Sequence, residues 1–386
     1  MPQITPEVES FARIKVFGVG GSGKHALNHM VNAKVKGVEF VGVNTDAQDL
    51  HNTLAKKKIH IGKNVTRGLG AGMNPELGRR AAEETKEELQ ESIKGSDMVF
   101  IAGGMGGGTC TGAGPVVAKI AKEMGALTVG VVTKPFFFEG AQRMRIAEQG
   151  IAEMKESVDA LIVIPNDRLL SAVSKETTAK EAFAMCDEVL KQAVEGISDL
   201  ITTPGEIANI DFADVRAILE NAGPALMGVG FASGEKRAEE AAKMAINSPL
   251  LDVSVAGARG MLFSIAGGDD LTLFEIQDAA KIITESIDPE AKVIFGTIRD
   301  EKLKKNELKI TVIASGFPET GNKKTLFPLG VADSSKVKSP QQAMPAAPVT
   351  TSERSPEPPK AAPKPASPEE DDDWSAVPAF LRRTKK

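Results

Sequence analysis

The chain contains no tyrosine, one tryptophan and two cysteines among its 386 residues. Single-stranded RNA is usually bound by stacking its bases on exposed aromatic side chains, and few such side chains are available here. Two cysteines cannot form a disulfide framework, so we expect a reducing, cytoplasmic environment. No apolar run reaches the roughly 20 residues of a membrane span, and residues 1–9 lack the apolar core of a secretory signal.

Positive charge is not in excess either. The formal net charge is −5 and the pI is about 5.7, so the chain has no broad basic surface and we expect no nucleic-acid partner. The four histidines have neither the HExxH spacing nor the cysteine partners of common zinc sites. We therefore expect no metal site built on histidine.

The most informative segment that is present is a glycine-rich loop at residues 106–112, GGGTCTG. It follows an apolar run at residues 98–102 and precedes a helical pattern at residues 113–124. A strand, a glycine loop and a helix in this order present backbone N–H groups and the positive end of a helix to a phosphate. Flexible linkers are also rich in glycine, but they do not stand between a buried strand and an amphipathic helix.

A second glycine loop, residues 18–25, follows a strand expected at residues 14–17. Its three glycines at 18, 20 and 23 match the GxGxxG pattern of dinucleotide-binding folds, and Asp46 supplies the acid expected about 20 residues further on. The loop also matches most of the P-loop pattern, but His25 replaces the Ser or Thr that holds Mg²⁺. Each match alone is unspecific, so a nicotinamide- or flavin-dependent oxidoreductase remains an alternative.

The alternation of strands and helices predicts two folded domains. Near-continuous apolar runs separated by helical stretches are typical of a doubly wound α/β domain with a parallel sheet, and they lie at 14–17, 38–43, 97–102, 126–132 and 159–164. A long amphipathic pattern at 179–202 predicts a central helix. A smaller α+β domain is expected after it, with strands at 226–231, 262–265, 291–298 and 310–314 and helices near 235–246 and 272–285.

The composition changes sharply near residue 331, where serine, alanine, lysine and proline become dominant. Such a segment cannot bury enough apolar surface to offset its chain entropy, so we expect a disordered linker. An apolar cluster flanked by charge follows at the end of the chain, and it favours a docking peptide that orders on binding. The residues expected to bind a partner are Val377, Pro378, Phe380, Leu381 and Arg382.

The two glycine loops, in this order, resemble the signature of the tubulin superfamily. The surrounding segments resemble the FtsZ family of bacterial cell-division GTPases, and they lie at 68–75, 133–136, 138–140, 164–169, 209–216 and 377–383. This resemblance implies a protein that polymerises head to tail into the filaments of a division ring and hydrolyses GTP at the subunit interface. It also implies Mg²⁺ held mainly through the phosphates, and a cytoplasmic location at the division site beneath the membrane.

The same resemblance sets the expected organisation. It implies a flexible N-terminus (1–12), a GTP-binding domain (13–178), the connecting helix (179–202), a C-terminal α+β domain (203–317), a disordered linker (318–373) and a partner-binding peptide (374–386). The partners would be further copies of the chain and, through the peptide, membrane-anchoring and regulatory division proteins, with no direct membrane insertion.

The nucleotide is expected between the two glycine loops, with its base and sugar contacted by later segments. The expected contacts are Gly20, Gly21, Ser22, Gly23, Lys24, His25, Asn44, Asp46, Ala71, Gly72, Gly107, Gly108, Thr109, Cys110, Thr111, Thr133, Glu139, Arg143, Asn166, Phe183 and Asp187. The resemblance further implies that the carboxylate of Asp187 accepts from N1 and N2 of guanine and so rejects adenine. Glu139 and Arg143 alternatively form a surface ion pair, and Phe183 alternatively packs in the core.

Asn209, Asp211 and Asp214 are the residues that the resemblance makes catalytic. Two carboxylates one turn apart on a helix can orient a water, although acids at a helix start also commonly cap it. Because this loop follows the long helix, it should lie far from the phosphate loops, and the resemblance implies that it reaches the nucleotide of the next subunit. Contacts of this kind do not close, so filaments result.

The sequence departs from the family at Ser22, His25, Cys110 and Phe137. These departures leave open a nucleotide-binding scaffold that assembles without turnover. Cys110 stands at the expected start of a helix, where the thiol pKa is usually lowered, so we expect it to be sensitive to oxidation.

Overall fold

The computed structural model describes residues 12–170, 176–203, 208, 210–248, 255–268, 270–300 and 303–317. The linker at 318–373, the peptide at 374–386 with its five expected partner-binding residues, and nearly all of the N-terminal segment 1–12 lie outside the described residues. Asn209 lies outside them as well.

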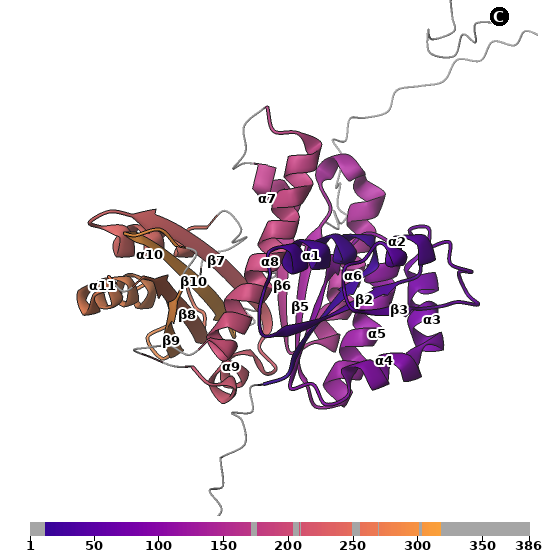
Figure 1. Ribbon diagram of the computed structural model, residues 1–386, viewed down its shortest axis with the longest axis horizontal. Coiled ribbons are helices and arrows are strands. Elements are labelled where there is room, and N and C mark those ends of the chain that lie inside the picture. The colour runs from indigo at the N-terminus through magenta and orange to yellow at the C-terminus, as the bar shows by residue number, and fades with distance from the viewer. Residues whose placement is uncertain are drawn as a thin grey trace, which may run out of the picture. The chain divides into compact units, whose positions relative to one another are not determined.

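The described strands form one sheet in the order β3-β2-β1-β4-β5-β6-β7-β10-β8-β9 (Figure 1). Strands β1 to β6 and the start of β7 pair in parallel. Their bounds are β1 Ile14–Val19, β2 Val38–Asn44, β3 Lys57–His60, β4 Met98–Gly104, β5 Leu127–Lys134, β6 Ala160–Pro165 and β7 Gly223–Ser233. The expected doubly wound parallel sheet is confirmed.

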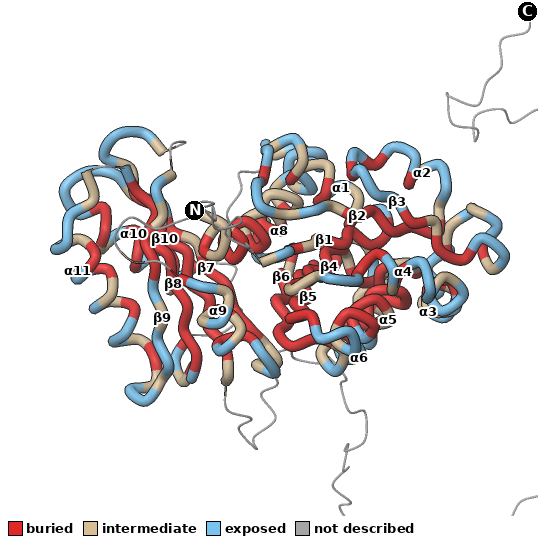
Figure 2. The backbone as a smooth tube through the Cα atoms, turned by 60° about the horizontal axis from the view of Figure 1, so that its bottom comes forward, coloured by how far each residue is buried: buried red, intermediate tan, exposed pale blue. Residues whose placement is uncertain are grey.

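Helices cover both faces of this parallel sheet. They are α1 Gly20–Asn32, α2 Ala47–His51, α3 Pro75–Glu84, α4 Lys86–Ile93, α5 Thr109–Glu123, α6 Ala141–Ser157, α7 Asn166–Leu170, α8 Ala179–Thr202 and α9 Phe212–Leu219. Alternate strand residues enter opposite cores: Val16 packs in the core that includes α1 and α8, and Phe17 packs in the core that includes α3 to α6. Figure 2 shows the central strands buried along most of their length, which explains their continuous apolar sequence.

Two features of this half differ from the sequence-based expectation. Strand β3 was not expected, because it lies at the edge of the sheet and only Ile59 of its four residues is buried. Helix α5 begins at Thr109 rather than near residue 113, because Gly108 is already in the right-handed helical region with φ −80° and ψ −46°. Half of the glycine-rich segment is therefore the first turn of a helix.

Helix α8 has the bounds that the apolar periodicity predicts. It opens with a capping box in which Thr178 and Glu181 exchange hydrogen bonds between side chain and backbone. Four of its residues are fully buried in the core shared with α1 and the sheet: Leu190, Ala193, Val194 and Ile197. The helix joins the parallel half of the sheet to the second half.

The second half has the smaller α+β arrangement that the sequence predicts. It contains β7, β8 Gly260–Gly267, β9 Lys292–Arg299 and β10 Glu307–Ser315, with helices α10 Arg237–Ile246 and α11 Leu273–Thr284. Strand β10 pairs antiparallel with β7 and β8, and β9 adds in parallel at the edge. Alanines of α10 and isoleucines of α11 pack against one face of these strands to form a separate core.

We predict that two glycines of α5 respond oppositely to alanine. A Cβ at Gly112 would overlap the carbonyl oxygen of Pro75, because α3 and α5 are in direct backbone contact. A Cβ at Gly114 would meet only side-chain atoms at 3.8 Å or more. Gly112→Ala should lower the free energy of unfolding by about 3 kcal/mol, and the matched control Gly114→Ala should leave it equal or raise it by about 0.5 kcal/mol. Chemical denaturation without nucleotide measures both, and equal stability of the two variants would contradict this packing.

Candidate functional site

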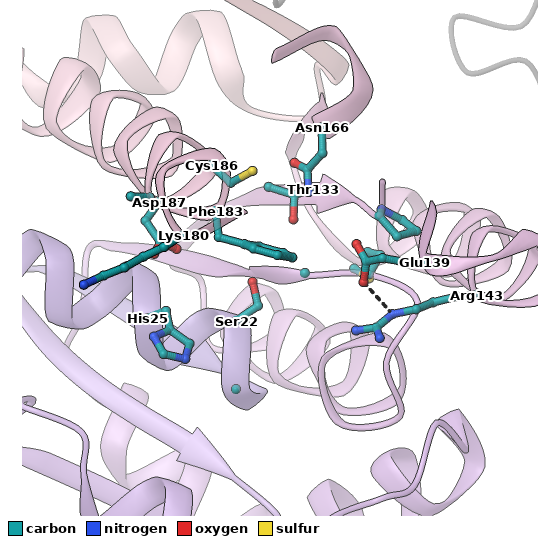
Figure 3. Close-up of a pocket in the computed structure, with 15 residues that line it drawn as sticks. Ser22, His25, Thr133, Glu139, Arg143, Asn166, Lys180, Phe183, Cys186 and Asp187 are labelled. Atoms are coloured by element: carbon teal, nitrogen blue, oxygen red, sulfur yellow. Dashed lines mark ion pairs between the residues drawn. The ribbon is translucent and has the colours of Figure 1, made fainter. Parts of the chain in front are cut away.

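A pocket of about 660 Å³ opens at the carboxyl ends of the parallel strands, between the first turns of α1 and α8 (Figure 3). In parallel sheets of this kind ligands bind at this edge. The pocket is lined by Gly21, Ser22, His25, Gly104, Met105, Thr133, Pro135, Glu139, Arg143, Asn166, Lys180, Phe183, Ala184, Cys186 and Asp187. Nine of the sequence-predicted nucleotide contacts are among these residues.

An aromatic ring and a carboxylate from α8 stand at one end of the pocket. Phe183 is 46% exposed and makes an edge contact with Phe136, with ring centroids 5.3 Å apart. It therefore offers an open face to a flat ligand instead of packing in the core. Asp187 stands one turn further along, and burial raises the pKa of its carboxyl to about 6, against an opposing effect of His29. His25 lies across from this end, and burial and the neighbouring Lys24 lower its pKa, against Asp49.

Polar groups at the opposite side of the pocket come from the start of α7, from the 3-10 turn Phe137–Glu139 and from α6. The amide oxygen of Asn166 is buried and has no hydrogen-bond partner among the described residues. A ligand with a hydroxyl or amino donor would satisfy this atom. Glu139 accepts from the backbone N–H of Phe136 and pairs with Arg143, whose Nε lies 3.2 Å from its Oε2. The alternative ion pair therefore forms, but it forms within the pocket lining.

The two glycine loops meet beside the pocket. A Cβ on Gly20, which has φ +74°, would lie 3.3 Å from the Cβ of Thr109 and 3.4 Å from the backbone nitrogen of Cys110. The first turns of α1 and α5 thus bring their free N–H groups together, as a phosphate site requires. A Cβ at Gly107 would meet no described atom within 4 Å, so open space remains beside this loop. Gly108, in contrast, packs against Ala71.

Polar side chains behind the glycine loops satisfy one another. The hydroxyls of Thr45 and Thr109 lie 2.7 Å apart. Asp49 accepts from Asn44 and forms an ion pair with Lys24. The Asp46 carboxylate caps α2 by accepting from the N–H of Asp49. Three of the expected nucleotide contacts therefore bond to other protein groups and do not line the pocket: Lys24, Asn44 and Asp46.

The remaining expected contacts lie around the same loops. Gly23 is packed against the backbone of Gly18 and the carbonyl oxygen of Ala102. The Thr111 hydroxyl accepts from the N–H of Gly106 at 2.9 Å and so closes the loop. Gly72 has φ +52° and open space around it.

The lowered thiol pKa on which the expected oxidation sensitivity of Cys110 rests is contradicted. Its side chain points away from the loop into the core, where a Cβ on Gly103 would lie 2.5 Å from the sulfur, and burial raises the pKa of the thiol to about 12. A thiol that stays protonated is a poor nucleophile. Because Gly103 has no Cβ, Cys110 is accommodated where the family has glycine, and its backbone N–H still faces Gly20.

Six pocket residues were not predicted from the sequence: Gly104, Met105, Pro135, Lys180, Ala184 and Cys186. Lys180 lies three residues before Phe183 and Ala184 lies three before Asp187, so the helical repeat of α8 could have identified them. Nothing in the spacing marks Met105 and Pro135, which enter through the ends of β4 and β5.

The two expected catalytic acids stand at the start of α9. Asp211 accepts from the N–H of Asp214 at 2.8 Å, and its own N–H lies 3.4 Å from Oδ2 of Asp214. The capping arrangement that the sequence left open is therefore present. Capping occupies one oxygen of each carboxylate, so each retains an oxygen that can accept from a water.

This acid pair lies near the amino ends of the parallel strands, whereas the pocket lies at their carboxyl ends. Arg216 of α9 donates to the carbonyl oxygen of Gly125, just before β5, whereas Thr133 near the other end of β5 lines the pocket. A strand rises about 3.3 Å per residue, so the ends of β5 are about 23 Å apart. Figure 1 shows α7, which begins at the pocket residue Asn166, and α9 near opposite ends of α8.

The fold and this pocket define a nucleotide-binding protein of the tubulin/FtsZ class. Residues 13–175 match the Tubulin/FtsZ family, GTPase domain, and residues 223–318 match the FtsZ family, C-terminal domain. A solved structure of FtsZ from M. jannaschii, described as an empty dimer, is 47% identical with a TM-score of 0.76, covering 80% of this chain and 89% of that one. The chain belongs to the FtsZ family and is a cell-division GTPase.

More distant structures share the fold. CetZ2 from Haloferax volcanii, solved as a GTPγS-bound protofilament, is 20% identical with a TM-score of 0.67, covering 81% of this chain and 96% of that one. CetZ1 from the same organism, solved as a GDP-bound monomer, is 21% identical with a TM-score of 0.70, covering 81% of this chain and 97% of that one.

Two further observations concern metals and membranes. Within the described ranges, no three His, Cys, Asp or Glu side chains gather into a group that could hold a metal ion. None of the helices in the described part of the chain is long and apolar enough to cross a bilayer.

We predict that Asp187→Asn stabilises the nucleotide-free protein at pH 7 and weakens GTP binding. The folded pKa of about 6 lies above the ordinary 3.8. The stability that protonated Asp187 contributes is therefore complete below about pH 4 and is lost as the pH rises through about 6. A neutral amide avoids this loss, so the unfolding temperature at pH 7 should rise by roughly 2–4 °C.

GTP binding by the same variant should be about tenfold weaker, because a charged acceptor becomes a neutral one. Asp278→Asn, on the exposed face of α11, is the matched control. Thermal melts with and without GTP measure both effects, and an unchanged melting temperature together with unchanged GTP protection would contradict the assigned role of Asp187.

Proposed function

We propose that this protein assembles head to tail, and that the acid pair of one subunit completes the GTP site of the next. The observation that carries the proposal is the separation of the pocket from Asp211 and Asp214 by about the length of β5. Within one subunit the acids do not reach the nucleotide. A second subunit placed end to end brings them alongside it, and the repeated contact produces a filament.

In the proposed complex the guanine lies against Phe183 with its N1 and N2 donors on Asp187. The buried amide oxygen of Asn166, which has no hydrogen-bond partner among the residues that the structure describes, accepts from the base or the ribose, and Glu139 and Arg143 flank the sugar. Phosphate oxygens accept from the backbone N–H groups at the starts of α1 and α5, including those at Gly21 and Thr109. The open space beside Gly107 accommodates the phosphates.

Mg²⁺ fits this site only through the phosphates. His25 replaces the hydroxyl residue of a P-loop, and no acidic cluster of the described residues forms a cage. Bound to phosphate oxygens and water, the ion would neutralise charge on the phosphates. The protein's own contribution to hydrolysis is the orientation of a water by Asp211 and Asp214, together with Asn209 from the same loop.

The rim of the pocket supports assembly. Three large apolar side chains near the glycine loops are exposed: Leu69 at 84%, Phe137 at 71% and Phe138 at 56%. Exposed apolar residues gathered around a polar site commonly mark an interaction surface. A neighbouring subunit seated there would bury them and exclude water from the phosphates. The dimer of M. jannaschii FtsZ and the protofilament of CetZ2 are arrangements that proteins of this fold adopt.

The C-terminal peptide at 374–386 extends the proposal to partners. Its apolar residues between acidic and basic groups suit binding to membrane-anchoring and regulatory division proteins. Such contacts would hold the filaments at the division site beneath the membrane without any insertion of the chain.

We predict that Asp214→Ala and Asp214→Asn both bind GTP normally and lose turnover by about a hundredfold or more. Their polymers should persist longer after GTP addition, because the nucleotide is not cut. The asparagine variant retains an acceptor for the α9 cap, so a residue that serves only as a cap would tolerate it. Phosphate release and sedimentation measure the outcome, and normal turnover by Asp214→Asn would refute the catalytic role.

A further inference from the structure

An arginine of helix α9, the helix that presents the acid pair, forms a hydrogen bond with the GTPase half of the molecule. The Nη2 atom of Arg216 donates to the carbonyl oxygen of Gly125 at 3.3 Å, and its Nη1 atom lies 3.2 Å from Oε1 of Glu220. The guanidinium carbon stands 5.2 Å from the centre of the Phe212 ring. The side chain is therefore held on three sides, although 33% of it remains exposed.

A buried carboxylate fixes the chain where α9 ends. Asp159 accepts from the backbone N–H of Thr128 at 2.9 Å and from that of Asn221 at 3.4 Å, and the ammonium of Lys122 lies 3.1 Å away. Lys122 also donates to the side-chain oxygen of Asn221 at 3.1 Å. Asn221 has φ +51°, so the turn that leaves α9 has a left-handed residue held from two directions. We call Lys122, Asp159 and Asn221 the Asp159 node.

The other side of α9 is fixed to the second half of the sheet. The hydroxyl of Ser315, a fully buried residue of β10, donates to the carbonyl oxygen of Ile218 at 2.9 Å. Strand β7 begins two residues after the Asp159 node, where the N–H of Gly223 donates to the carbonyl oxygen of Asp159 at 2.8 Å. Val215, Ile218 and Leu219 of α9 also pack in the apolar core that includes α1 and α8, so Arg216 and the node add polar contacts with the GTPase half to this packing.

We propose that Arg216 and the Asp159 node are positioning residues for GTP hydrolysis, because they fix α9 to the edge of the sheet opposite the pocket. This inference rests on the proposed function, in which Asp211 and Asp214 act on the nucleotide of a neighbour. The acids occupy the first turn of α9, and the contacts with Gly125 and Asp159 lie along its last turn and beyond. A small rotation about these contacts displaces both carboxylates from the water that they orient.

The test compares Arg216→Ala, Arg216→Lys and Lys122→Ala with wild type and with a control, Lys119→Ala. The control removes an exposed cation from α5, the helix that also carries Lys122. Turnover per polymerised subunit should fall about tenfold or more for the two alanine variants at residues 216 and 122. Arg216→Lys, which retains one donor for Gly125, should recover part of the loss. Affinity of the dilute protein for a fluorescent GTP analogue should stay within about twofold, since the pocket lies at the other edge.

Mixing experiments separate positioning from nucleotide binding. Gly107→Val places a side chain in the open space beside the glycine loop and should block the phosphates while leaving its own α9 intact. In a 1:1 copolymer with Arg216→Ala, about a quarter of the junctions pair an intact nucleotide site with an intact α9, so about a quarter of wild-type turnover should return. Sedimentation confirms that both variants enter the polymer.

Three results would overturn the inference. They are full turnover by Arg216→Ala, a loss of turnover matched by a loss of GTP affinity, and no recovery in mixtures that sediment together. The proposed function fails separately, if wild-type protein cuts GTP at its full rate while monomeric. In that case GTP is hydrolysed at a site within one subunit. If all the variants then keep the wild-type turnover of the monomer, the positioning role is ruled out as well.

Discussion

The arrangement of the molecule depends on the parallel pairing of β1, β2, β4, β5 and β6. Parallel strands place all their carboxyl ends at one edge, and the helices that follow them place their positive N-termini there. The loop after α8 is necessarily at the other edge, because a 24-residue helix spans about 36 Å. One subunit therefore has a nucleotide pocket at one end and an acid pair at the other. The head-to-tail assembly that we propose follows from this separation.

The departures from the family are absorbed locally by packing. The side chain of Cys110 fills the space that Gly103 leaves on β4, and its N–H remains at the glycine loop. Ser22 lies beside Gly104, where a Cβ would come within 2.9 Å of the serine oxygen. His25 stays at the pocket wall, where burial and the neighbouring Lys24 lower its pKa. With all three residues in place, the first turns of α1 and α5 meet at Gly20 and Thr109.

Much of the fold could be predicted from the sequence, because the strands buried on both faces are continuously apolar and α8 has a wide apolar repeat. Strand β3 could not, since an edge strand with two lysines carries almost no apolar signal. The pocket residues on loops were predicted through motifs, whereas Met105 and Pro135 enter it only because β4 and β5 end side by side. The burial of Cys110 also escaped prediction: a position at a helix start suggests a reactive thiol, and only the packing against Gly103 shows that the thiol is buried with a raised pKa.

The central claim is that a bound GTP is cut only when a second subunit brings its acid pair to the pocket. Phosphate release measured across a dilution series, alongside the amount of polymer, tests it most directly. The account predicts almost no turnover below a threshold concentration and a linear rise above it, in step with the polymer. Full specific activity in dilute protein shown to be monomeric would contradict it.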